Sequence, residues 1–318
     1  MKDSTPIAVT SRSFSRHPVL RQELLDKYSD VRFNDEGMTL QGQQLIDFAL
    51  NRRKLITALE TIDEAFLVAV PDLEVISKYG VGTDMLNIEA MIRHHVQLGW
   101  KGGVNKRSVT ELAITFMISL LRLVPQCNRD IREGIWKNRK GVYLSGRTVG
   151  IIGCGHIGKD LTRLLKVFDC RVLVNDIRDY PEFYAESGAQ PVTLEYLLSQ
   201  ADVVTLHLPL DESTRGILST EHLALMKPEA ILINTARGGL VDEDALKHAL
   251  IGGRLAGAAF DVFAIEPAED HELLCLPNFL STPHIGGSAE EAILAMGRAA
   301  ISGLDEHALP IANCYPPG

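Results

Sequence analysis

The stretch TVGIIGCGHIGKDL, residues 148–161, decides the fold of this chain. A short apolar run leads into three glycines, Gly153, Gly155 and Gly158, and a helix-like pattern follows. In a strand–loop–helix unit the first glycine permits the tight turn, the second admits a pyrophosphate, and the third lets helix and strand pack closely. The phosphates would meet the free N–H groups of the helix N-terminus. The stretch predicts a dinucleotide site, although so short a pattern also arises in a tight turn without a ligand.

The next apolar run, RVLVND (171–176), ends in an acidic residue. A carboxylate at Asp176 would accept hydrogen bonds from an adenosine ribose and repel a 2′-phosphate, so the sequence favours NAD over NADP. Arg178 could soften this preference because it lies two residues further on. The alternative interpretation of Asp176 is a strand-end carboxylate without a ligand.

Apolar runs alternate with helix-length amphipathic segments along the chain, which predicts an α/β fold with parallel sheets. The runs are typical of buried parallel strands because they are short and rich in Val, Ile and Leu. They cover 7–11, 55–59, 73–80, 96–100, 148–153, 171–176, 202–209, 230–236, 255–262 and 279–284. A long helix is predicted from near Lys106 to near Glu133, and a last helix over 288–303.

Breaks in composition at GWKGGVN (99–105) and PHIGGS (283–288) predict domain boundaries. Residues 101–287 contain a complete set of dinucleotide-fold strands, so we expect an NAD-binding Rossmann domain there. Residues 1–100 with 288–318 would form a second doubly wound, flavodoxin-like domain that binds substrate. The chain would cross twice between the domains, and a cleft between them would close on substrate to exclude water.

Composition excludes several classes of partner. The 318 residues carry a formal charge of −9, which argues against a general nucleic-acid-binding surface. The cysteines are odd in number and form no CxxC pair, which favours reduced thiols in the cytoplasm over disulfides or a zinc site. The longest apolar run, 112–121, is too short to span a bilayer, and the N-terminus has no apolar stretch of signal-peptide length. We expect neither a metal nor a membrane partner.

Three short motifs follow predicted strands. INTARGG places Arg237 just past one strand, FDVFAIEP places Glu266 after another, and STPHIGG places His284 after a third. Strands of such a sheet end at one edge, where ligands bind, so a cation, a carboxylate and an imidazole should gather there. Taken singly, these residues are equally typical of a surface ion pair, a solvated loop acid and a capping side chain.

The three residue types suit the reduction of a 2-oxo acid, which needs a hydride at carbon and a proton at oxygen. A histidine has the right intrinsic pKa to supply the proton. A carboxylate bonded to its far nitrogen would orient the ring and stabilise the imidazolium. An arginine would bind the substrate carboxylate and polarise the carbonyl.

With these motifs in view, the sequence resembles the D-isomer-specific 2-hydroxyacid dehydrogenase family over nearly its whole length. The resemblance is carried by KYGVGTD (78–84), GVNKRSVTE (103–111), GIIGCGHIG (150–158), HLPLDESTRGIL (207–218), MKPEAILINTARGGLVDEDAL (226–246), GAAFDVFAIEP (257–267) and TPHIGG (282–287). It implies an NAD-dependent oxidoreductase, usually a dimer joined through the cofactor domain. The helix after Asn105 would suit that interface.

The resemblance also implies roles for individual residues. Arg237, Glu266 and His284 would be the catalytic triad, with His284 as the acid for reduction and the base for oxidation. Backbone N–H groups at Val81 and Gly82 would bind the substrate carboxylate, within a substrate loop formed by Lys78, Tyr79, Gly80, Val81 and Gly82. Cofactor contacts are implied at Gly153, Gly155, His156, Ile157, Gly158, Asp176, His207, Pro209, Thr214, Thr235, Ala236, Asp261, Gly286 and Gly287. Among them, His156 and Ile157 would contact the pyrophosphate, Pro209 would line the adenosine side, and Thr235 and Asp261 would position the nicotinamide amide.

The substrate is a separate question. Lys78 opens the substrate loop, and Arg12, Arg16 and His17 follow the first predicted strand. These cations could recognise a second anionic group, such as the phosphate of 3-phosphoglycerate. They could equally be solvated charges on a loop. In that case the expected activity is that of a general 2-oxo acid reductase of the glyoxylate or hydroxypyruvate type.

Departures from related patterns limit the alternatives. Phosphite-oxidising relatives carry a lysine where this chain has Val81, which weakens the interpretation that the protein oxidises phosphite. We expect no serine-sensing regulatory domain, because no long C-terminal extension is present. A different class, an NADH-sensing co-repressor-like protein, shares the fold and the triad, and is disfavoured because the chain lacks long terminal tails.

Overall fold

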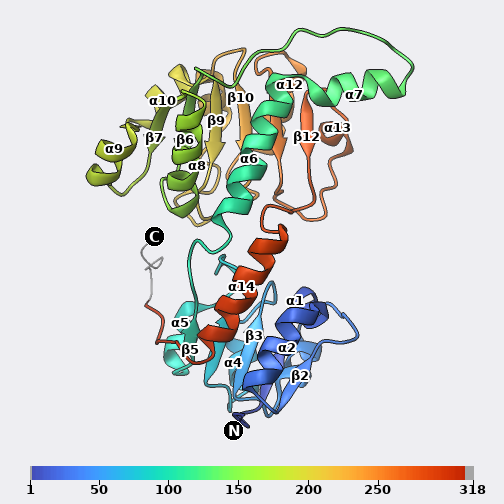
Figure 1. Ribbon diagram of the computed structural model, residues 1–318, viewed down its shortest axis with the longest axis vertical. Coiled ribbons are helices and arrows are strands. Elements are labelled where there is room, and N and C mark those ends of the chain that lie inside the picture. Colours follow the sequence, from blue (N-terminus) through green and yellow to red (C-terminus); the bar gives the residue numbers. More distant parts are fainter. Residues whose placement is uncertain (1, 312–318) are drawn as a thin grey trace. The chain divides into compact units, whose positions relative to one another are not determined.

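The computed structural model describes residues 2–311 and contains two compact units. Unit 1 consists of Met1–Asn105 with Ala289–Gly318, and unit 2 consists of Lys106–Ser288. Each unit is built on a parallel sheet with helices packed against it (Figure 1). The expected class, two doubly wound parallel α/β domains, is confirmed.

Unit 2 has a seven-stranded sheet in the order β12-β11-β10-β9-β6-β7-β8. From β6 the chain adds β7 and β8 on one side of the sheet and then β9 to β12 on the other side. The strand order therefore switches between β6 and β9, and in Rossmann sheets dinucleotides bind at such a switch point. The strands are β6 (Thr148–Ile152), β7 (Arg171–Asn175), β8 (Gln190–Pro191), β9 (Val203–Leu206), β10 (Ile231–Asn234), β11 (Gly257–Phe260) and β12 (Phe279–Ser281). The helices are α6 (Lys106–Leu121), α7 (Val124–Arg132), α8 (His156–Val167), α9 (Pro181–Ser187), α10 (Leu194–Gln200), α11 (Thr220–Leu225), α12 (Glu243–Ile251) and α13 (His271–Leu274).

Alternating side chains divide the core of unit 2 into two layers. Ile231 and Ile233 of β10 point to the face covered by α6, α8 and α9, whereas Leu232 points to the face covered by α10 to α13. Helices α6 and α8 lie in front of the sheet in Figure 1. Because both faces are covered, the central strands β6, β9, β10 and β11 are largely apolar, and this is why they could be recognised in the sequence.

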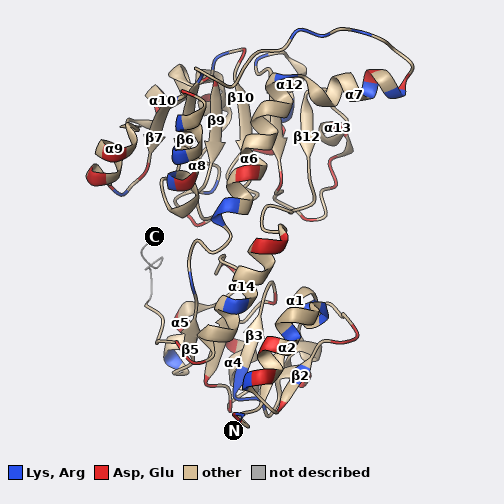
Figure 2. Ribbon diagram, in the orientation of Figure 1, with Lys and Arg blue, Asp and Glu red and all other residues tan. Residues whose placement is uncertain are grey.

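Unit 1 has a five-stranded sheet in the order β2-β1-β3-β4-β5, which is the flavodoxin-like order. Its strands are β1 (Ile7–Val9), β2 (Val31–Phe33), β3 (Lys54–Thr57), β4 (Val75–Lys78) and β5 (Gln97–Gly99). Its helices are α1 (Arg12–Arg16), α2 (Pro18–Lys27), α3 (Gln43–Ala49), α4 (Glu64–Ala69), α5 (Ile88–Arg93) and α14 (Glu290–Gly303). Acidic and basic residues are interspersed on the helices of both units (Figure 2).

The structure differs from the sequence-based expectation at three elements. The predicted helix from Lys106 to Glu133 is wrong as a single element, because α6 and α7 are separated by Leu123 in a left-handed conformation and are bent by 63°. Pro125 lies in the first turn of α7, where a missing N–H is tolerated but a continuing helix is not. Strands β2 and β8 were not expected.

Among the described residues, no single helix is both long and apolar enough to cross a membrane. The bent pair α6 and α7 would reach that threshold only together, by length and composition alone.

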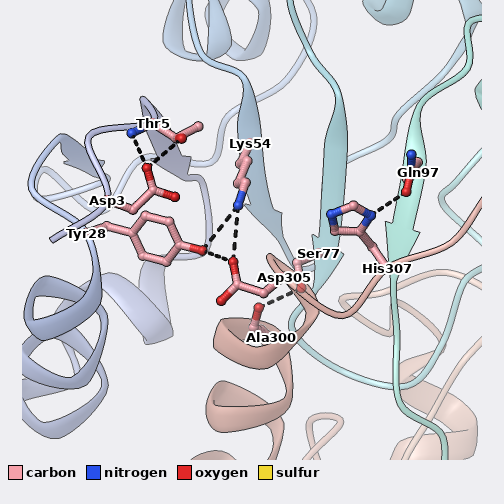
Figure 3. A network of polar contacts seen from close by, with 9 residues as sticks. All are labelled: Asp3, Thr5, Tyr28, Lys54, Ser77, Gln97, Ala300, Asp305 and His307. Atoms are coloured by element: carbon pink, nitrogen blue, oxygen red, sulfur yellow. Dashed lines mark hydrogen bonds and ion pairs between the residues drawn. The ribbon is translucent and has the colours of Figure 1, made fainter. Parts of the chain in front are cut away.

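A polar network fastens the end of α14 to the rest of unit 1 (Figure 3). The Tyr28 hydroxyl donates to the Asp305 carboxylate, and Lys54 Nζ lies 3.2 Å from both groups. Ser77 Oγ donates to Ala300 O at 2.6 Å. Burial would raise the pKa of Asp305, but the hydrogen bonds from Tyr28 and Lys54 outweigh it and leave the pKa below its ordinary value. Its contribution to stability is therefore present above about pH 4 and is lost as the pH falls through the lowered pKa.

We predict that Tyr28→Phe lowers the free energy of unfolding by about 1–3 kcal/mol, because a partly buried network loses the hydroxyl that bonds to the charged groups of Asp305 and Lys54. Urea unfolding monitored by circular dichroism would measure the change. Tyr143→Phe is the matched control, since Tyr143 is exposed. Equal midpoints for the two variants would show that the network contributes nothing.

Candidate active site

The glycine loop has the geometry that a dinucleotide requires. Gly153 has a φ of +98°, and a Cβ on Gly155 would meet no atom within 4 Å, so the backbone there is open to a ligand. A Cβ on Gly158 would lie 2.2 Å from Gly153 O, so only glycine lets α8 approach the loop this closely. No side chain caps the N-terminus of α8, which begins at His156 and Ile157. These residues fit a pyrophosphate bound by backbone N–H groups.

Asp176 lies at the end of β7, beside this loop. Its Oδ2 accepts the Cys154 N–H at 2.6 Å, and its Oδ1 accepts the Arg178 N–H at 2.8 Å. The carboxylate is thus oriented by backbone donors on both sides. Its role as the ribose acceptor stays a prediction.

Two buried polar atoms lie past neighbouring strand ends without a hydrogen-bond partner among the described residues. They are His207 Nδ1, after β9, and Thr235 Oγ1, after β10. The other ring nitrogen of His207 lies 3.0 Å from Thr205 Oγ1. Burial lowers the pKa of His207 to about 3, so its ring is neutral at physiological pH. Because buried polar atoms are normally paired, these two fit a polar ligand such as a nicotinamide.

The loop that carries Arg237 is shaped by the residue that ends β10. Asn234 is fully buried, and its side-chain amide donates to Arg237 O at 2.8 Å while its carbonyl accepts the Ala236 N–H at 3.1 Å. Arg237 Nη1 donates to Ala236 O at 2.8 Å. Sequence analysis did not identify Asn234, because its role depends on bonds to the backbone and not on a reactive group.

Gly238 brings the loop after β10 against the loop after β11. A Cβ at this position would lie 1.9 Å from the carbonyl of Phe263 and 2.4 Å from Ala264 N. The Ala264 N–H also donates to Glu243 Oε1 of α12 at 2.8 Å. Burial raises the pKa of Glu243, although the Ala264 N–H acts in the opposite sense. Glu243 is a second supporting residue that the sequence analysis missed.

Glu266 and His284 form a hydrogen-bonded pair. His284 Nδ1 lies 2.8 Å from Glu266 Oε2, and Glu266 Oε1 accepts the Phe263 N–H at 3.1 Å. Both side chains are partly exposed, at 43% for His284 and 38% for Glu266. The structure therefore brings together two of the three predicted catalytic residues, with the carboxylate on the ring nitrogen that orients the imidazole.

The backbone that carries His284 is held by Asp261, which is 1% exposed at the end of β11. Its Oδ1 accepts the Ile285 N–H at 2.7 Å and the Thr282 hydroxyl, and its Oδ2 accepts the Gly286 N–H at 2.7 Å. His284 itself has a φ of +55°, which is uncommon outside glycine. The predicted contact between Asp261 and a nicotinamide amide is untested, and these protein donors are what the carboxylate contacts in the structure.

The remaining predicted cofactor residues lie in the same unit. Thr214 Oγ1 donates to Pro209 O at 2.8 Å and accepts the Asp211 N–H at 2.8 Å, which closes the turn after β9. Gly286 O accepts from Ser108 Oγ at 2.6 Å, which ties the segment containing Gly286 and Gly287 to α6. These contacts hold the segments that carry the predicted cofactor residues.

The predicted substrate loop lies in unit 1, directly after β4. Tyr79 is buried and packs edge-on against Phe14, while Gly80, Val81 and Gly82 are half-buried. Lys78 is only 3% exposed, and its Nζ donates to Ala58 O and Tyr79 O.

The cations proposed to accompany Lys78 have contacts elsewhere in unit 1. The Arg16 guanidinium lies beside Gly37, where a Cβ would approach it to 2.0 Å. His17 Nε2 pairs with Glu290 at 3.0 Å, and Arg12 is exposed on α1. A joint role of these residues in binding a second anion stays a prediction.

Known proteins resemble this chain in sequence and fold. Residues 114–286 match the family model described as D-isomer specific 2-hydroxyacid dehydrogenase, NAD binding domain. The D-3-phosphoglycerate dehydrogenase of Methanocaldococcus jannaschii is 40% identical over 228 residues, which are 71% of this chain and 44% of that protein. The glyoxylate reductase of Thermococcus litoralis is 33% identical over 277 residues, which are 84% of this chain and 82% of that protein. The solved structure of a glyoxylate reductase from Paecilomyes thermophila has a TM-score of 0.84 at 26% identity and covers 94% of both chains.

This chain belongs to the D-isomer specific 2-hydroxyacid dehydrogenase family, and its residues 114–286 match the NAD-binding domain of that family. The resemblance found in the sequence and the expected NAD cofactor are confirmed. The chain spans less than half the length of the phosphoglycerate dehydrogenase that it matches.

We predict that Asp261→Asn loosens the segment that carries His284, because an amide presents a donor to N–H groups that need an acceptor. The amide protons of Ile285 and Gly286 should exchange with solvent about 10–100-fold faster, which corresponds to the loss of about 1.5–3 kcal/mol. Hydrogen exchange measured by mass spectrometry or NMR would check this. Unchanged protection in a folded variant would contradict the assigned role.

Proposed function

We propose that the protein is an NAD-dependent dehydrogenase that interconverts a D-2-hydroxy acid and the corresponding 2-oxo acid. The observation that carries the proposal is the His284–Glu266 pair, at 2.8 Å, in the loops that follow the strands of an NAD-binding domain. We also propose that unit 2 binds NAD and that unit 1 supplies the substrate loop.

When bound, NAD supplies or accepts the hydride that is exchanged with C2 of the acid. In the direction of reduction, His284 gives the proton on its far ring nitrogen to the carbonyl oxygen, and the reverse reaction returns it. Glu266 holds the ring through Nδ1 and stabilises the imidazolium that precedes this transfer. Arg237 binds the carboxylate and polarises the carbonyl through charge-assisted hydrogen bonds.

His284→Ala should lower kcat by about 10²–10⁴-fold, because the proton donor is removed, while the affinity for NADH stays close to that of the wild type. Glu266→Gln should lower kcat less, because the ring keeps a hydrogen-bonding partner but the imidazolium loses its counter-charge. Steady-state kinetics and fluorescence titration with NADH would measure these effects. His271→Ala is the control, because that histidine is exposed on α13. Unchanged turnover of His284→Ala would refute its role.

For the substrate, we propose a small 2-oxo acid without a required second anionic group, such as glyoxylate or hydroxypyruvate. This is supported by the contacts of Lys78, Arg16 and His17 with other groups of unit 1. A phosphorylated acid is the second candidate, favoured by the 40% identity to a D-3-phosphoglycerate dehydrogenase.

A panel of 2-oxo acids separates the candidates. NADH oxidation would be followed with glyoxylate, hydroxypyruvate, 2-oxoglutarate, phosphohydroxypyruvate and phosphonopyruvate. Preference for the first two supports a general reductase, and preference for the phosphorylated members supports the second candidate. Tight binding of NADH with no turnover would favour an NADH-sensing protein.

We further propose that the protein is a cytoplasmic homodimer joined through unit 2. The four described cysteines are free thiols, which suits a reducing compartment. Exposed apolar side chains gather on α7 and the segment that follows it, which project from the body of unit 2 in Figure 1. We call this set the apolar surface, and it comprises Val124, Ile131, Ile135, Trp136, Val142 and Tyr143. Patches of this kind mark protein–protein contacts.

The segment that carries the apolar surface is anchored to α6 and α7. Arg139 makes a bidentate ion pair with Asp130, at 2.6 and 2.9 Å, and the Val142 N–H donates to Leu121 O at 2.9 Å. An anchored apolar surface loses little conformational entropy on association, which favours a stable contact.

Trp136→Asp should weaken the dimer by about tenfold or more, because Trp136 is 93% exposed and would be a central aromatic contact. Sedimentation velocity over a concentration series would measure the dissociation constant. Val167→Asp is the matched control, since Val167 is an exposed apolar residue on α8. A monomeric wild type would contradict the dimer.

A further inference from the structure

Two side chains of unit 1 bind carbonyl groups of the substrate loop. Lys78 Nζ donates to Tyr79 O at 3.3 Å, and also to Ala58 O at the end of β3. Trp100 Nε1 donates to Val81 O at 2.9 Å. Alternate carbonyls of the loop are therefore held by a lysine from β4 and by a tryptophan that follows β5.

These two contacts fix the direction of the N–H groups in the loop. In a planar trans peptide, the N–H points opposite to the carbonyl of the same unit. The Gly80 N–H consequently points away from the Lys78 ammonium, and the Gly82 N–H points away from the indole. Within residues 2–311, the N–H groups of Gly80, Val81 and Gly82 donate to no protein acceptor, although the loop is half-buried. Half-buried N–H groups without partners favour an anionic ligand.

The segment around Ala58, whose carbonyl accepts the hydrogen bond from Lys78, is itself held by hydrogen bonds. The Ala58 N–H donates to Glu60 Oε2 at 2.8 Å, and the same oxygen accepts the Thr57 hydroxyl at 2.8 Å. The peptide groups on both sides of Ala58 are thus engaged, one by a carboxylate and the other by an ammonium. A buried ammonium is costly without acceptors, so the carbonyls of Ala58 and Tyr79 stabilise Lys78 in its buried position.

Gly80 allows the ammonium to lie against the loop. Its φ is +122°, in a region that favours glycine, and a Cβ there would lie 3.3 Å from Lys78 Nζ. The ammonium of Lys78 therefore lies close to the backbone of Gly80, in the loop whose N–H groups have no protein acceptor among the described residues.

We propose that Lys78 and Trp100 are positioning residues, which hold the carbonyls of the substrate loop so that its N–H groups receive the carboxylate of the 2-oxo acid. Neither side chain recognises a second anionic group. This inference rests on the proposed function, because it takes the anion to be the substrate carboxylate.

The test compares Lys78→Met, which keeps the length of the side chain but removes the ammonium, with Trp100→Phe, which keeps an aromatic ring but removes the N–H. Each variant should raise KM for glyoxylate about tenfold or more, since one hydrogen bond that orients the loop is lost, with kcat changed by less than about threefold. Each should also weaken the binding of oxamate, a non-reacting isostere of a 2-oxo acid, by a similar factor in calorimetric titrations with NADH present. The affinity for NADH should not change. Lys101→Met is the matched control, because Lys101 is exposed.

The oxamate titration separates this inference from the proposed function. If the wild type binds oxamate but turns over no acid, the proposed function fails, and the affinities of the variants still decide the role of Lys78 and Trp100. Unchanged oxamate affinity in folded variants would overturn the inference, and so would a fall in kcat at constant KM. A wild type that does not bind oxamate would overturn it as well. If Lys78→Met does not fold, Trp100→Phe alone carries the test.

Discussion

The buried carboxylate of Asp261 is the interaction on which the rest of the site depends. An ionised side chain at the end of a covered sheet is costly unless donors surround it, and the donors come from Thr282, Ile285 and Gly286. The segment between β12 and α14 therefore curves around the Asp261 carboxylate. His284 lies in that turn with a positive φ, and its ring is hydrogen-bonded to Glu266. The backbone position of His284 is thus set by electrostatics at the edge of the sheet.

Much of the fold follows from local sequence. Strands covered on both faces are mostly apolar, so β6, β9 and β10, with one polar residue each, could be recognised as nearly continuous apolar runs. β2 could not, because VRF has only one fully buried residue and lies at a sheet edge. β8 is two exposed residues and has no pattern at all. The break between α6 and α7 did have a signal in Pro125, which the strong apolar periodicity on either side obscured.

The residues of the candidate site also differ in how far the sequence indicated them. Arg237, Glu266, His284 and the glycine loop could be proposed as site residues from the sequence, because their residue types carry chemistry and their motifs follow strand ends. Asn234 and Glu243 were not, because their function consists of bonds to the backbone of a neighbouring loop, and these bonds depend on sheet register. The burial of Lys78 could not be foreseen either, since lysine is usually exposed and its acceptors lie on two separate segments.

The contact at Gly238 has a consequence for how such a protein can change. With a peptide group pressed against its Cα, this glycine locks the loop of Arg237 to that of Glu266, and Asp261 locks the backbone of His284 to the same sheet. Insertions or large side chains in any one of these loops would disturb the other two. The loop after β4 in unit 1 is held instead by its own side chains, Lys78 and Trp100. A substitution in one of the three loops of unit 2 is therefore best interpreted together with the other two, because a change in the backbone of one loop is transmitted to its neighbours through the contacts of Gly238 and Asp261.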